Sequence, residues 1–133
     1  LWQSGKGFYI GEHLVPDGGV IILASPLIDG TGDHPEFASA LRMSVKEIES
    51  LLAGRKVSDP LGVSASCAIR KIMETKTLVL VTDNCHVKKE VEEISGIPVC
   101  SSIGDALQLV QSKKMRRVAL VQDLYVLPLE RKK

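Results

Sequence analysis

The chain has 133 residues, with 17 basic against 16 acidic side chains and a formal net charge of +1. A chain of this length forms one domain with its own core. The charge balance argues against nucleic acid as a partner, since the one dense basic cluster, residues 113–117, follows a predicted helix whose negative end attracts cations. No apolar stretch reaches the ~20 residues of a membrane-spanning helix, and no signal peptide is recognisable. We therefore expect neither a nucleic-acid nor a membrane partner.

The first 14 residues combine helical spacing with frequent glycine. Gly5, Gly7 and Gly11 each cost about 1 kcal/mol relative to alanine in a helix, but glycine is favoured where another body approaches closely. The segment predicts a helix or helical arm that packs against a missing partner domain or a ligand. Because the chain also lacks an initiating methionine, we expect residues 1–133 to be a single domain of a longer protein.

The apolar run at residues 20–24 predicts a strand buried on both faces, inside a parallel sheet. The segment 29–33, Asp-Gly-Thr-Gly-Asp, follows at the carboxyl end of this strand, where open α/β sheets usually bind ligands. The backbone amides of Gly30, Thr31 and Gly32 could hold an anion there. The two flanking carboxylates would repel pyrophosphate, and a plain turn accounts for the same pattern.

Capping residues predict where the helices begin. The predicted helix starts are at Asp33, Ser44, Asp59, Asn84 and Ser102. Leu61 is expected on the inward face of the helix that follows Asp59. Apolar runs between the helices predict further strands at residues 77–82, 97–100 and 117–122. This alternation predicts an α/β fold in three layers, with a mostly parallel sheet of about four strands and helices on both faces.

The reactive side chains form no recognisable catalytic or metal-binding set. The histidines, His13, His34 and His86, are separated from one another and are expected to be surface or capping residues. The three cysteines are odd in number and widely spaced, which matches neither a disulfide framework nor a zinc site. They indicate a reducing compartment, so we expect a cytoplasmic protein.

Three segments together resemble the C-terminal domain of the lactate racemase family, the nickel-pincer enzymes. They are residues 2–6, Trp-Gln-Ser-Gly-Lys, the glycine-led strand at 18–22, and residues 29–37. The similarity continues through residues 77–83 and 101–107 to Pro128, and so covers essentially the whole chain. It implies that residues 1–133 are the C-terminal domain of a racemase or epimerase.

The resemblance also implies a substrate and a cofactor. The substrate would be a small 2-hydroxy acid, and the cofactor a nicotinate-derived pincer nucleotide that carries nickel. In that family a histidine accepts the hydroxyl proton while hydride passes to the cofactor ring. These histidines and the nickel anchors belong to the N-terminal domain, so none of the catalytic or metal-binding residues is expected in this chain, and the N-terminal domain is the implied partner.

An aromatic-Gln-x-x-Lys motif is what this domain contributes in the family, and Trp2, Gln3 and Lys6 match it. Lys6 would hold the substrate carboxylate, Gln3 would hydrogen-bond the substrate, and Trp2 would lie against the cofactor. Trp2 replaces the usual tyrosine, and residues 58–63 lack an aromatic residue that lactate racemases have nearby, so we expect a substrate other than lactate. The alternative is a non-enzymatic α/β module that binds a small anion at residues 29–33.

Overall fold

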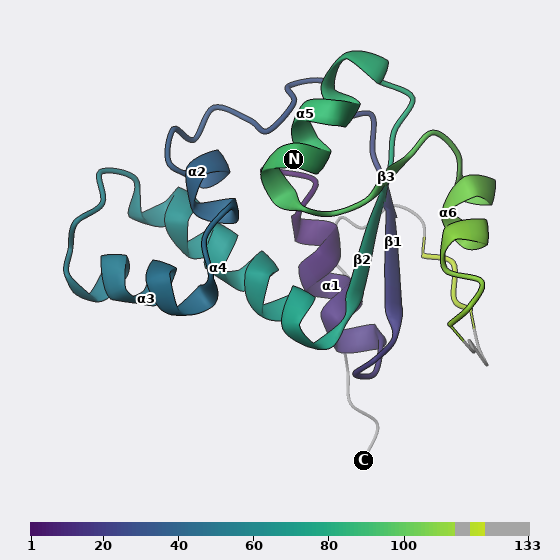
Figure 1. Cartoon of the computed structure of the whole chain (residues 1–133), viewed down its shortest axis with the longest axis horizontal. Helices are drawn as coiled ribbons and strands as arrows, with labels where there is room; N and C mark the ends of the chain where they lie inside the picture. Colours follow the sequence, from purple (N-terminus) through teal and green to yellow (C-terminus); the bar gives the residue numbers. More distant parts are fainter. Residues whose placement is uncertain (114–117, 122–133) are drawn as a thin grey trace.

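The computed structural model describes residues 1–113 and 118–121, in which a three-stranded parallel sheet lies between helices (Figure 1). The strands are β1 (Val20–Ala24), β2 (Thr77–Val81) and β3 (Val99–Cys100), in the order β1-β2-β3. The whole of β1 pairs with β2, from Val20 beside Thr77 to Ala24 beside Val81. Because all three strands are parallel, their carboxyl ends meet at one edge of the sheet. The predicted α/β class is confirmed.

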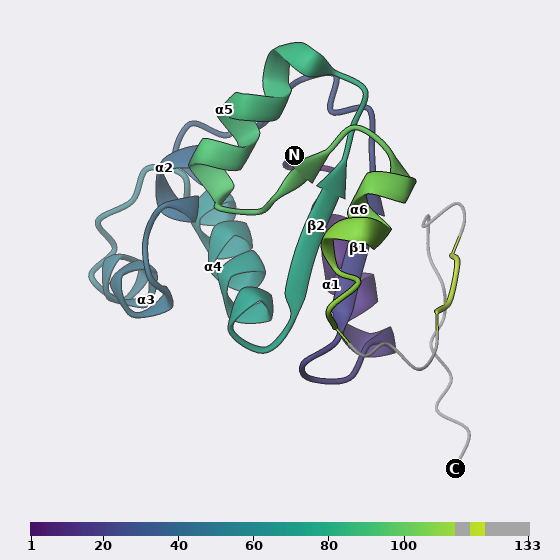
Figure 2. The same cartoon turned by 45° about the vertical axis from the view of Figure 1, so that its right-hand side comes forward.

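Helices cover both faces of the sheet. They are α1 (Lys6–Leu14), α2 (Phe37–Leu41), α3 (Val45–Ala53), α4 (Pro60–Thr75), α5 (Cys85–Ser95) and α6 (Ile103–Leu109). Leu78 and Leu80 of β2 face the core shared with α1, α4 and α5, whereas Val79 and Val81 pack with Ala106 of α6. Figure 2 shows α6 on the opposite side of the sheet from α4. Strand alternation thus gives β2 two buried faces, as the predicted three layers require. No helix in the described ranges has the length and apolar character needed to cross a bilayer.

Two predicted features of the helices are wrong in detail. The helix expected from Asp33 begins only at Phe37, and its capping residue Glu36 makes no side-chain bond to it. The Glu36 carboxylate instead accepts a 2.6 Å hydrogen bond from the backbone N–H of Asp59, far along the chain. Leu61, expected to face inward, is 63% exposed, because α4 packs through another face against α1, α2 and α3.

The sheet has three strands in the part of the chain that the structure describes, one fewer than expected. Residues 118–121 form no strand, and Val118 and Leu120 are 77% and 81% exposed. Residues 117 and 122, the ends of the expected strand, lie outside the described ranges. The apolar run predicted a strand here, but a short apolar run specifies neither the edge it pairs with nor its register. The pattern alone therefore could not show whether the run joins the sheet.

Helix α1 packs on its own domain. Phe8 is fully buried in the core, and a Cβ built on Gly11 would lie 2.7 Å from Cγ2 of Ile21 in β1. The Tyr9 hydroxyl donates a 3.1 Å hydrogen bond to the carbonyl of Ala65 in α4. The close approach that the glycines predicted is present within the chain itself, against Ile21 of β1 and Ile69 of α4. Packing of this segment on a partner domain or a ligand stays a prediction.

Candidate functional site

A cavity of about 670 Å³ lies at the carboxyl end of β1. Its walls come from the turn that precedes α1 and from the loop that follows β1. The lining residues are Leu1, Trp2, Gln3, Ser4, Ser25, Pro26, Leu27, Ile28, Asp29, Gly32 and Asp33. The cavity lies at the carboxyl end of the first strand, where the sequence predicts a ligand site; binding there stays a prediction.

The turn and the loop are joined by backbone contacts. The N–H of Trp2 donates a 3.1 Å hydrogen bond to the carbonyl of Thr31, and the amino nitrogen of Leu1 donates to the carbonyl of Gly30. Gly32 has a φ of +97°, and a Cβ built on it would lie 2.7 Å from the Cβ of Trp2. Only glycine allows both this backbone conformation and this approach, so Gly32 seats Trp2 at the cavity wall.

The loop after β1 begins with a strained residue. Leu27 has a φ of +46° although it is not glycine, and its side chain is almost fully buried. Such a conformation costs of order 1–3 kcal/mol and persists only where its surroundings hold it. Here Nδ2 of Asn84, the N-cap of α5, donates a 3.3 Å hydrogen bond to the Leu27 carbonyl. The ends of β1 and β2 therefore cooperate in shaping one wall of the cavity.

Of the three motif residues, the structure places two at the cavity. Trp2 is half-buried and Gln3 exposed, and both line the cavity. Lys6 is exposed at the start of α1, and its backbone N–H donates a 3.2 Å hydrogen bond to the Gln3 carbonyl. It is not among the lining residues. Gln3 and Lys6 are thus one turn apart, and only Gln3 is in the wall of the cavity.

The indole of Trp2 also contacts two aromatic rings of its own chain. Its ring centroid lies 3.8 Å from that of His34, with the planes tilted by 37°, and 5.4 Å from that of Phe37 in an edge-to-face arrangement. Phe37 belongs to the main core. Part of the indole surface is therefore used in packing, in a residue that also lines the cavity.

The candidate anion loop already uses two of its amides. The N–H of Gly30 donates to the carbonyl of Leu27 at 3.0 Å, and that of Gly32 donates to the carbonyl of Asp29 at 2.8 Å. The carboxylates of Asp29 and Asp33 add negative charge beside the same cavity. This arrangement favours the plain turn, although anion binding at Gly30, Thr31 and Gly32 stays a prediction.

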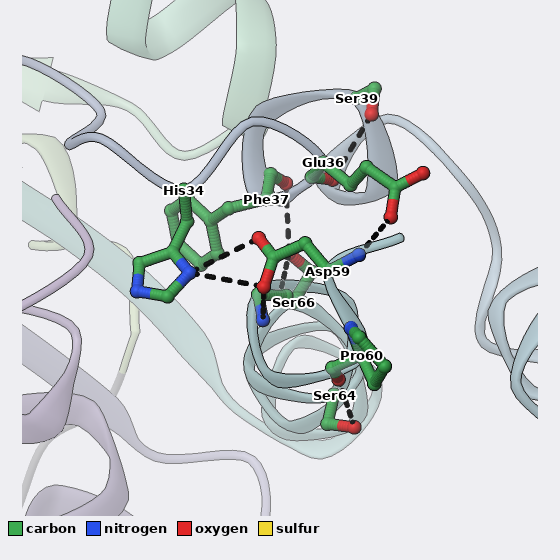
Figure 3. A network of polar contacts seen from close by, with 9 residues as sticks. His34, Glu36, Phe37, Ser39, Asp59, Pro60, Ser64 and Ser66 are labelled. Atoms are coloured by element: carbon green, nitrogen blue, oxygen red, sulfur yellow. Dashed lines mark hydrogen bonds and ion pairs between the residues drawn. The ribbon is translucent and has the colours of Figure 1, made fainter. Parts of the chain in front are cut away.

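Sequence reasoning missed two polar pairs near the cavity. The hydroxyls of Ser4 and Ser25, both in the cavity wall, lie 2.6 Å apart. His34, expected to be a surface or capping residue, is partly buried, and its Nδ1 lies 3.1 Å from each carboxylate oxygen of Asp59 (Figure 3). The position of Ser25 at the end of a strand could have indicated that its hydroxyl lies in the cavity wall. The contact between His34 and Asp59, which are 25 residues apart, could not be predicted from any local pattern.

Asp59 is held as an ionised acceptor. Its carboxylate accepts a 3.0 Å hydrogen bond from the N–H of Gly62, which caps α4. This bond is the main cause that holds the pKa of Asp59 below its ordinary value; burial opposes it, and the contact with His34 lowers the pKa further. Asp59 thus joins the start of α4 to the segment that leads from the cavity to α2.

A second, shallower hollow of about 380 Å³ lies between α3 and α4, away from the cavity. It is bordered by Cys67 and by an ion pair of 2.7 Å between Lys71 and Glu49. Both charged groups are about half exposed, and such pairs contribute little to stability or recognition. Burial raises the pKa of the Cys67 thiol, which favours its less nucleophilic protonated form.

The fold and the cavity define an open parallel α/β domain with a candidate ligand site at the end of its first strand. No protein-family model matches the sequence, and no curated protein matches it significantly. Among solved structures, the chain is similar in fold to the lactate racemase apoprotein from Thermoanaerobacterium thermosaccharolyticum, with a TM-score of 0.71 and 23% sequence identity. The likeness covers 86% of this chain and 28% of that one. The chain therefore has the fold of part of a lactate racemase and spans little more than a quarter of its length.

Proposed function

We propose that the chain is the C-terminal domain of a nickel-pincer-dependent racemase or epimerase of a small 2-hydroxy acid. One observation carries the proposal: within a fold similar to part of a lactate racemase, Trp2 and Gln3 line the cavity at the end of β1. These are two of the three residues that match the family's motif. The N-terminal domain of the same protein would close the cavity.

Gln3 and Lys6 would bind the substrate. The exposed amide of Gln3 has both donors and an acceptor for a hydroxyl and a carboxylate. Lys6 is one turn away and exposed, and its ammonium can form a charge-assisted hydrogen bond to a carboxylate. Since Asp29 and Asp33 also line the cavity and would repel an anion, the substrate carboxylate would lie on the Lys6 side.

The cavity fits a flat ring better than a phosphate. Trp2 offers an apolar aromatic surface on which a nicotinate-derived ring can stack, whereas the carboxylates of Asp29 and Asp33 disfavour pyrophosphate beside them. Within residues 1–113 and 118–121, no three His, Cys, Asp or Glu side chains form a metal-binding group. The family resemblance implies that the nickel anchors belong to the N-terminal domain, and we assign them there. When bound, the cofactor would supply the hydride acceptor, and this chain would orient the substrate beside it.

An exposed apolar residue at the cavity supports a domain partner. Ile28 lines the cavity and is 80% exposed, next to the half-buried Trp2. A second surface placed over Ile28 would remove its apolar side chain from water, which favours association. We assign that surface to the N-terminal domain of the same protein.

The experiment uses the complete natural protein, loaded with nickel cofactor and assayed by chiral chromatography on a panel of 2-hydroxy acids. We expect racemisation or epimerisation of at least one acid, and a loss of about ten- to a hundredfold in kcat/KM in Lys6→Ala. Lys46→Ala is the matched control, because Lys46 is exposed in the first turn of α3, away from the cavity. No turnover of any acid by nickel-loaded protein would contradict the proposal and favour the anion-binding module.

A further inference from the structure

The imidazole of His34 lies between the indole of Trp2 and the carboxylate of Asp59. The ring centroids of His34 and Trp2 are 3.8 Å apart, and both Asp59 oxygens are 3.1 Å from Nδ1 (Figure 3). The side chains of His34 and Asp59 are only 25% and 12% exposed. The imidazole is thus held on one side by a polar contact and on another by a ring at the cavity wall.

Asp59 itself has little freedom to move. Its carboxylate accepts from the N–H of Gly62, and its own N–H donates to the Glu36 carboxylate at 2.6 Å. With an ionised acceptor facing Nδ1, we assign the proton to that nitrogen, since the hydrogen bond determines the tautomer. The start of α4 therefore fixes the plane of the His34 ring.

We propose that His34 is a positioning residue for Trp2, and that Asp59 holds the imidazole at the angle from which it supports the indole. The inference rests on the proposed function, in which the indole lies against the cofactor. Trp2 borders the cavity with one part of its surface and packs on His34 and Phe37 with another. The His34 ring therefore determines how the indole faces the cavity.

A purely structural role for the pair predicts something different. Asp59 already caps α4 through Gly62 without help from His34, and asparagine is as good an N-cap as aspartate. Asp59→Asn should therefore keep the helix start while it removes the ionic acceptor from His34. If the pair serves only to cap α4, this change leaves Trp2 undisturbed.

The test places 5-fluorotryptophan in the complete natural protein and follows the ¹⁹F resonance of Trp2, assigned by its loss in Trp2→Phe. We expect the resonance to shift by more than its linewidth in His34→Ala, and in the same direction but less in Asp59→Asn. His86→Ala is the matched control, because His86 is exposed on α5 and should leave the resonance unchanged. Far-UV circular dichroism verifies that each variant is folded. If His34→Ala does not fold, the Trp2 resonance in Asp59→Asn alone decides the test.

Kinetics test the consequence for the reaction. In His34→Ala, kcat should fall about ten- to a hundredfold while KM stays nearly constant, because Gln3 and Lys6 still bind the substrate and only the orientation of the indole is lost. An unmoved Trp2 resonance in both folded variants would overturn the inference, and so would a moved resonance with unchanged kcat. A wild-type protein that turns over no 2-hydroxy acid would refute the proposed function instead, and the resonance would still decide whether His34 positions Trp2.

Discussion

Replacement of Gly32 by alanine should destabilise the domain because two independent costs meet at this residue. The backbone φ of +97° is a conformation that L side chains rarely adopt, and a residue forced into the left-handed region costs roughly 1–2 kcal/mol. In addition, the new Cβ would lie 2.7 Å from the Cβ of Trp2. Overpacking of this kind typically costs a further 1–3 kcal/mol or so. We therefore expect Gly32→Ala to lower the free energy of unfolding by about 2–5 kcal/mol.

Gly18→Ala separates the two costs. Gly18 also has a positive φ, +77°, but a Cβ built there has no atom within 4 Å, so this variant should show the backbone cost alone. Urea unfolding of the 133-residue chain gives both free energies. A Gly32→Ala variant no less stable than Gly18→Ala would refute the predicted contact with Trp2.

A double-mutant cycle tests the identity of the clashing atom. Because the overlap involves the Cβ of Trp2, Trp2→Gly should recover part of the loss in Gly32→Ala, whereas Trp2→Ala keeps that Cβ and should not. Equal recovery by both variants would show that the indole ring, and not the Cβ, is the obstacle.

Four further outcomes are expected. The 133-residue chain should fold alone but neither racemise 2-hydroxy acids nor retain nickel, and stoichiometric nickel after purification would contradict this. In the complete enzyme, the double variant Gln3→Ala, Lys6→Ala should stay folded and lose at least about tenfold in kcat/KM, so full activity would remove this site. Ser44→Ala should lose about 1 kcal/mol of stability with its capping box, visible as a lower melting temperature. Folding lowers the pKa of Asp59, so its contribution to stability is present above its ordinary pKa of about 3.9 and is lost as the pH falls through the lower folded value. In urea titrations at acid pH, the free energy of unfolding should therefore fall less steeply with pH in Asp59→Asn than in the wild type.

Features that depend on neighbouring residues could be predicted from the sequence, and those that depend on distant contacts could not. The capping box of Ser44 followed from the three-residue spacing to Glu47, and the N-cap at Asp59 followed from the adjacent proline; both are present. Glu36 had an equally good local pattern, yet its carboxylate accepts from the backbone of Asp59, which competes with a cap on its own helix. A local pattern gives no information about a competing partner 23 residues away.

The same distinction between local patterns and distant contacts applies to the candidate site. The position of the cavity followed from the apolar run of β1 and the loop behind it, because ligand sites in parallel sheets lie at the carboxyl ends of strands. The contact between Gly32 and Trp2 depends on how the turn before α1 meets that loop. The His34–Asp59 pair depends on where α4 begins relative to it. Neither pairing has a sequence period or a fixed spacing, so only the folded chain brings these residues together.

The position of α3 has a consequence for evolution. This helix packs on α4 and α2 at the side of the domain, and none of its residues lines the cavity at the end of β1. Substitutions in α3 would therefore be selected against only when they lower the stability of the domain. Homologous chains should therefore diverge fastest along α3 and in residues 54–58 before Asp59, while the turn before α1 and the loop after β1 change slowly and together.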